Sequence, residues 1–281
     1  MTKKNITDFR TLRGKLPADA FLLGPKEPDS LPQDLIDEKI WKSIISFPDD
    51  VSLRISDNHG TELKAMHELW ASWIESIGEE KDAIWYVMLD VADELQACLF
   101  NSLNGFYRVA ASCLRSALEL TTTGTYFQLI LAISDLLKWK EGKNKSIHFG
   151  KACDYLHENP QTRTLNDFLK SKVGFSIFNQ KSANKPEGWA RKLHSELSNF
   201  VHSRSTHSLG MMWEGSNGPI YVPESFGKVY ALCLDTMALA YVLLIMKLNL
   251  IRNSHLPTYL FQSPKVRPSQ VAVYSYEFFW G

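Results

Sequence analysis

One helical pattern limits the fold of this chain more than any other feature, and it runs from Gly105 to Thr123. Apolar residues recur there at the i, i+3, i+4 and i+7 spacing of a single helix face. They are Phe106, Val109, Ala110, Cys113, Leu114, Ala117 and Leu118. Spacing this regular predicts a long helix with one side buried in the core.

The same stretch carries a second line of side chains, which is polar and consists of Arg108, Ser112, Arg115, Glu119 and Thr122. These residues are again three and four apart, so they form one stripe along the helix. Arg115 and Glu119 can pair with each other or with a neighbouring helix. The stripe is therefore either a solvated face or a polar contact between helices.

Similar periodicity predicts further helices before and after this one. Their approximate ranges are 61–77, 80–101, 126–139, 147–156, 187–203 and 223–251. Gly124 marks a bend or a break after the central helix. Because most of the connections are short, the helices are expected to pack antiparallel in a bundle.

Three segments show the patterns of β-strands instead. Val51, Leu53 and Ile55 alternate with polar residues, which predicts a half-buried strand. Two short apolar runs flank a glycine-rich turn over about 209–222, which predicts a β-hairpin. The C-terminal tail alternates aromatic and polar residues from Ala272 to Trp280, which predicts an extended strand.

These patterns together predict a mainly α fold, an antiparallel helical bundle with an inserted β-hairpin and a small sheet contributed by the termini. The expected domains are an extended N-terminal arm with a short strand over 1–60, the helical bundle with its hairpin over 61–255, and a C-terminal aromatic tail over 256–281. The arm is rich in proline and has little periodicity.

Composition limits the function. The 281 residues have a formal net charge of zero, which argues against a broad electrostatic surface for nucleic acid. The four cysteines are far apart in sequence and are expected to be buried free thiols. His194 and His202 would lie about 12 Å apart along a helix, too far to share a metal ion. No metal or other cofactor is expected.

The segment from Tyr230 to Ile251 is long and apolar enough to raise the question of a membrane span. Asp235 and Lys247 lie inside it, and each charge costs roughly 2.5–3.5 kcal/mol near the centre of a bilayer. We therefore expect a buried core or interface helix and a cytoplasmic protein. The helix is apolar around so much of its circumference that a second copy, in a homodimer, or the N-terminal arm is expected to cover it.

Two short motifs resemble the HEPN superfamily, in its divergent bacterial branch. They are LRSALE in the central helix and LSNFVH from Leu197 to His202. The resemblance implies a helical, often dimeric protein, and many members are metal-independent RNases of toxin–antitoxin, abortive-infection and other antiphage systems. Their active site is an arginine and a histidine four to six residues apart on a late helix, with a polar residue from an earlier helix.

The resemblance assigns His202 to the histidine position, where it could act as base or acid in RNA cleavage. The arginine position falls on Ser195, Glu196 or Leu197. Another arginine would have to take this role, and Arg204, Arg191 and Arg115 are the candidates, with Arg115 and Arg204 favoured.

The supporting candidates are Glu119 and Ser198, which would orient the centre, and Asn199 beside them. In the alternative interpretation, His202 packs at a helix end while Ser198 and Asn199 bond the backbone, and Arg115 and Glu119 form a structural pair.

Two function classes follow. One is an RNase or toxin of a prokaryotic defence system, which acts on RNA. The other is a catalytically inactive helical module that binds a protein or RNA partner, as the missing arginine and the neutral charge suggest. They differ in whether His202 and an arginine converge in an exposed groove.

Overall fold

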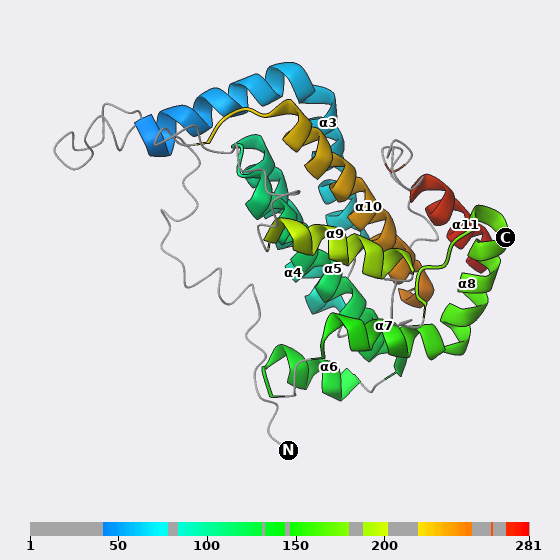
Figure 1. Ribbon diagram of the computed structural model, residues 1–281. Helices are drawn as coiled ribbons and strands as arrows, with labels where there is room; N and C mark the ends of the chain where they lie inside the picture. Colours follow the sequence, from blue (N-terminus) through cyan, green and yellow to red (C-terminus); the bar gives the residue numbers. More distant parts are fainter. Residues whose placement is uncertain are drawn as a thin grey trace. The chain divides into compact units, whose positions relative to one another are not determined.

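The computed structural model describes residues 42–77, 84–130, 133–143, 147–179, 188–201, 219–248, 260 and 268–280. About 89% of these residues are helical, and no β-strand lies within those ranges. The helices in chain order are η3 (Lys42–Ser46, a π-helix), α3 (Phe47–Ile77), α4 (Ile84–Leu103), α5 (Tyr107–Ile130), α6 (Ile133–Lys140), α7 (Phe149–Glu158), α8 (Pro160–Val173), α9 (Trp189–Val201), α10 (Pro223–Leu248) and α11 (Pro268–Trp280) (Figure 1).

The predicted strand at Val51–Ile55 is wrong, because these residues belong to α3. Pro48 stands at the start of this helix, and Asp49 and Asp50 lie in its first turn, where proline and acidic residues favour helix initiation. Val51 and Ile55 are buried while Leu53 is 60% exposed. Two apolar residues four positions apart lie on the same side of a helix and also on the same side of a strand. A stretch of five residues is therefore too short for the sequence to distinguish the two structures.

The predicted C-terminal strand is also wrong, because residues 268–280 form α11. Tyr274 and Phe278 alternate as in a strand, but they are also one helical turn apart. Both rings contact Phe168 of α8, at centroid distances of 6.4 and 5.3 Å. Packing against α8 and α10 therefore decides the conformation of this segment.

The predicted hairpin at 209–222 lies mostly outside the described residues, and its described end, 219–222, leads into α10. The two terminal strands that were expected to join it in a sheet are helices. The predicted fold, a bundle with a small sheet, is therefore wrong, and only its helical character is confirmed.

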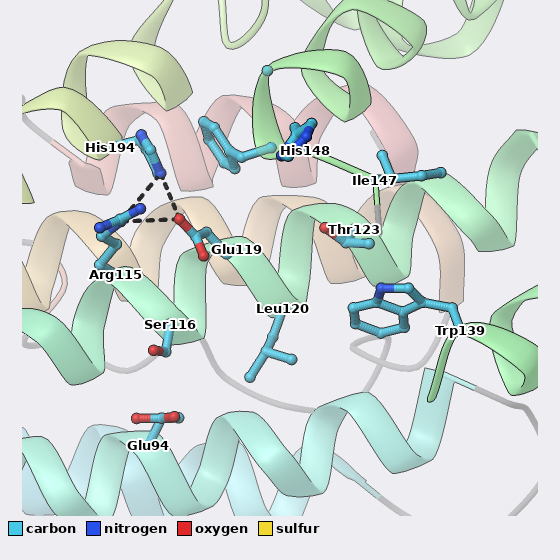
Figure 2. Close-up of a pocket in the computed structure, with 12 residues that line it drawn as sticks. Glu94, Arg115, Ser116, Glu119, Leu120, Thr123, Trp139, Ile147, His148 and His194 are labelled. Atoms are coloured by element: carbon cyan, nitrogen blue, oxygen red, sulfur yellow. Dashed lines mark hydrogen bonds and ion pairs between the residues drawn. The ribbon is translucent and has the colours of Figure 1, made fainter. Parts of the chain in front are cut away.

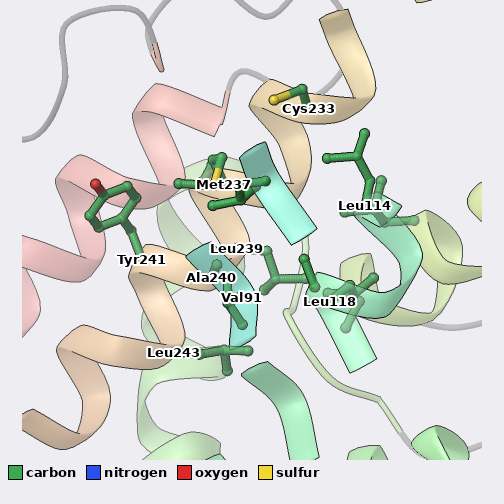
Figure 3. Close-up of a cluster of buried hydrophobic side chains, with 14 of the residues drawn as sticks. Val91, Leu114, Leu118, Cys233, Met237, Leu239, Ala240, Tyr241 and Leu243 are labelled. Atoms are coloured by element: carbon green, nitrogen blue, oxygen red, sulfur yellow. The ribbon is translucent and has the colours of Figure 1, made fainter. Parts of the chain in front are cut away.

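The central helix of the sequence pattern is α5, which contacts α4, α6, α7, α9 and α10. Leu114 and Leu118 are fully buried, and they lie beside residues of α4 and α10 (Figure 3). Gly124 does not break α5, which runs through it to Ile130. A Cβ atom there would lie 2.9 Å from Cγ1 of Val87 on α4, so glycine allows the two helices to approach closely.

The apolar helix of the sequence pattern is α10. By length and composition its segment Pro223–Met246 could cross a membrane, but 94% of the apolar window is buried inside the structure. Helices α3, α5, α9 and α11 contact it. Tyr241 packs edge-on against Trp73 of α3, at a centroid distance of 5.5 Å. The chain's own helices thus cover α10.

The start of α9 is fixed by the loop that follows α8. Asn166 of α8 accepts hydrogen bonds from the backbone N–H groups of Ile177 and Phe178 and donates one to the carbonyl of Phe178. The N–H of Trp189 then bonds the carbonyl of Ser176, at 3.0 Å. This loop therefore sets the position from which α9 runs along α5.

A substitution of Gly188, the residue directly before α9, tests whether this loop fixes the start of the helix. Its φ angle is +89°, and an added Cβ would lie 2.8 Å from the carbonyl oxygen of Ile177. We expect Gly188→Ala to lower the free energy of unfolding by roughly 1–3 kcal/mol, measured by urea denaturation. Gly227→Ala is the control, because an added Cβ at that position of α10 would lie within 4 Å of no other described residue and alanine is favoured in helices. Equal stability of the two variants would contradict this role of Gly188.

Candidate active site

The polar stripe of α5 faces α9. Arg108 donates a hydrogen bond to the carbonyl of Val201, at the end of α9, over 2.8 Å. Two turns further along α5, Arg115 and Glu119 meet His194, which lies half-way along α9. Of the two interpretations of the stripe, the polar contact between helices is the one the structure contains.

Two side chains, those of Arg115 and His194, converge on one carboxylate oxygen of Glu119 (Figure 2). Oε1 of Glu119 lies 2.9 Å from Nε of Arg115 and 2.7 Å from Nε2 of His194. The two nitrogens are 3.4 Å apart. Arg115 Nε is always a donor, and an ionised carboxylate only accepts, so His194 Nε2 donates as well and both bonds end on Glu119. A neutral His194 then keeps Nδ1 as its proton acceptor.

Two contacts orient the imidazole of His194. One is the bond to Glu119, and the other is a parallel stack on Phe149 of α7, with ring centroids 4.1 Å apart and planes 10° apart. Phe149 is itself buried. Helices α5, α7 and α9 therefore each supply one part of the His194 environment, and they also contact one another.

The cluster lies in the wall of a cavity of about 590 Å³, a size typical of small-ligand sites. The cavity is lined by residues of α4, α5, α6 and α9 and of the segment that begins α7. They are Glu94, Arg115, Ser116, Glu119, Leu120, Thr123, Trp139, Ile147, His148, Phe149, Gly150 and His194. Charged and ionisable groups therefore share the cavity with the apolar surfaces of Trp139, Leu120 and Ile147 (Figure 2).

The two carboxylates of this cavity differ in their pKa values. Burial would raise the pKa of Glu119, but the bond from His194 and the charge of Arg115 outweigh burial and lower it. Burial raises the pKa of Glu94, with Asp93 adding to the effect and hydrogen bonds from Cys113 and Ser116 opposing it. Glu119 is thus held as an anion, while Glu94 is the more readily protonated of the two.

The structure brings together only part of the set of residues predicted as a site. Arg115 and Glu119 form their pair inside the cavity wall. Ser198 and Asn199 lie on α9 but do not line the cavity. His202 and Arg204 fall outside the described residues.

The pair is also more exposed than the sequence predicts. Because Arg115 lies beside the apolar face of its own helix, the pattern predicts a position near the interior, where loss of one partner of an ion pair costs roughly 3–5 kcal/mol. The side chains of Arg115 and Glu119 are 27% and 38% exposed, so the cost should be near the 0–1 kcal/mol of surface pairs.

Sequence reasoning considered His194 only as a metal ligand and missed its role in this cluster. His194 stands next to Leu193, at the edge of the apolar face of its helix. A histidine in that position is partly buried and close to the neighbouring helix. This position, combined with the polar stripe on α5, is the signal that could have indicated a contact.

Within the described ranges, no three His, Cys, Asp or Glu side chains are grouped as metal ligands. Cys98, Cys113, Cys153 and Cys233 are buried free thiols, as predicted. Comparisons of the chain with protein families, with curated proteins and with solved structures find no match. The resemblance to the HEPN superfamily stays a prediction.

The lowered pKa of Glu119 predicts a pH-dependent contribution to stability. A depressed pKa stabilises the folded state above the unfolded pKa of about 4.3, and this contribution is lost as the pH falls through the folded pKa. We expect Glu119→Gln to lower the thermal midpoint at pH 7 and to approach the wild type below about pH 4. Glu158→Gln, at an exposed position of α7, should follow the wild type throughout. A midpoint difference for Glu119→Gln that does not shrink as the pH falls below about 4.3 would contradict the ion-pair assignment.

Proposed function

We propose that this protein is a metal-independent RNase whose reaction centre is formed by Arg115, Glu119 and His194. The observation that carries the proposal is their convergence, within 3.4 Å of one another, in the wall of one cavity. RNA cleavage without a metal needs a base for the 2′-hydroxyl and a cation for the charge on phosphorus. Histidine and arginine supply these functions.

Each residue has a separate role in this proposal. His194 takes the proton of the 2′-hydroxyl on Nδ1, the nitrogen that does not bond Glu119. Glu119 fixes the tautomer and orientation of the ring, as a carboxylate does for histidine in other hydrolytic centres. Arg115 uses the guanidinium N–H groups other than Nε to bind the non-bridging phosphate oxygens.

The wider setting follows from the HEPN resemblance. We propose a cytoplasmic protein that acts as a toxin or effector in a prokaryotic antiphage or toxin–antitoxin system, as a homodimer or with a protein partner. Because the chain's own helices cover α10, a dimer interface has to use another surface.

A second candidate function is a catalytically inactive module that binds a protein or RNA partner. It is favoured by the same bonds that define the centre, because Glu119 already satisfies both Arg115 and His194 within the chain. In that case the cluster only joins α5 to α9, and its substitution would change stability without any change in RNA cleavage.

Cleavage of a single-stranded RNA by purified protein in the presence of EDTA separates the two candidates. We expect wild-type protein to yield 2′,3′-cyclic phosphate ends. His194→Gln should slow cleavage by about 10²–10⁴-fold and Arg115→Gln by about 10²–10³-fold, with thermal midpoints close to the wild type.

Two control variants match these changes in chemistry but lie on α3, away from the cavity. Arg54→Gln removes an exposed i, i+4 pair with Asp50, and His67→Gln removes an exposed imidazole. Both should cleave at the wild-type rate. If His202→Ala or Arg204→Ala abolishes cleavage while His194→Gln does not, the centre lies elsewhere. An inactive wild-type protein would favour the binding module.

A further inference from the structure

The cavity contains a second imidazole, that of His148, which the reaction centre described above does not use. His148 immediately precedes α7, and it forms no side-chain hydrogen bond to the helix that it caps. Its side chain is exposed and has no hydrogen bond, ion pair or ring contact to another described residue. The two histidines of the cavity therefore differ: His194 bonds a carboxylate, whereas the side chain of His148 has no such partner among the described residues.

The placement of His148 suits a separate chemical role. Both imidazoles line the same cavity, but no contact joins them within the described part of the chain. The ring of Phe149, the residue next to His148, covers one face of the His194 ring. In-line cleavage of a phosphodiester needs a base at the attacking oxygen and an acid at the leaving oxygen, on opposite sides of phosphorus. Two separate imidazoles around one cavity are suited to this requirement.

We propose that His148 is the general acid of the reaction, an inference that rests on the proposed RNase function. His194 removes the proton from the 2′-hydroxyl, and the 2′-oxygen forms a bond to phosphorus. The bond from phosphorus to the 5′-oxygen breaks, and protonated His148 transfers its proton to that oxygen. The products are a 2′,3′-cyclic phosphate and a 5′-hydroxyl. The protons balance over one cycle, because His194 then gives its proton to solvent water and His148 takes one up from it.

A change of leaving group tests this role directly. In the dinucleotide UpA the leaving group is the 5′-oxygen of adenosine, a poor alkoxide leaving group that needs an acid. In uridine 3′-(p-nitrophenyl phosphate) the leaving group is p-nitrophenolate, which is stable as an anion and needs no acid. We expect His148→Gln to slow UpA cleavage by about 10²–10⁴-fold and to stay within about threefold of the wild type on the nitrophenyl ester. His194→Gln should slow both substrates, because both need the base.

Glu94 is the competing acid, because it lines the same cavity. Glu94→Gln should leave the ratio of the two rates at its wild-type value. The inference is overturned if His148→Gln slows both substrates equally or neither, or if Glu94→Gln gives the leaving-group pattern instead. A wild-type protein that cleaves neither substrate overturns the proposed function, and the role of His148 with it. Because His148 is exposed, its variant should keep the wild-type thermal midpoint, which excludes misfolding as a cause.

Discussion

The structure depends on α5 satisfying two different environments at once. Its apolar face is buried against α4 and α10, and each fully buried leucine there contributes roughly 1.5–3 kcal/mol. Small residues let the neighbouring helices approach closely, as Gly124 does opposite Val87. Once this face is buried, the polar stripe must point elsewhere, and it meets α9. The position of the cluster is thus a consequence of core packing.

The ion pair at the centre of the cluster contributes little to folding. Arg115 and Glu119 are partly exposed, so solvent screens their attraction. What the cluster provides is a fixed geometry. Glu119 accepts hydrogen bonds from Arg115 and His194, and Phe149 stacks on the ring of His194. A histidine whose tautomer and orientation are fixed in this way is prepared for proton transfer without reorganisation.

Much of the helical structure could be predicted from the sequence, because periodicity of 3.6 persists over long segments such as α5. The errors came from short segments. At Val51–Ile55 and in the C-terminal tail, burial at i and i+4 imitates alternation, and contacts with distant helices decide the outcome. The pairing of Arg115 with Glu119 could be predicted because it is local. His194 could not be assigned, because its partners are 75 and 79 residues away in sequence and only tertiary packing brings them together.

The central claim is that substrate phosphate binds at the cluster of Arg115, Glu119 and His194. Imidazole ¹H–¹⁵N spectra recorded during titration with a 2′-O-methyl RNA, which binds but has no free nucleophile, test this claim directly. We expect the signals of His194 to shift with saturation. Those of His157, whose Nδ1 contacts the carbonyl of Phe178, should stay unchanged. Unchanged His194 signals at RNA concentrations that saturate the protein would contradict the claim.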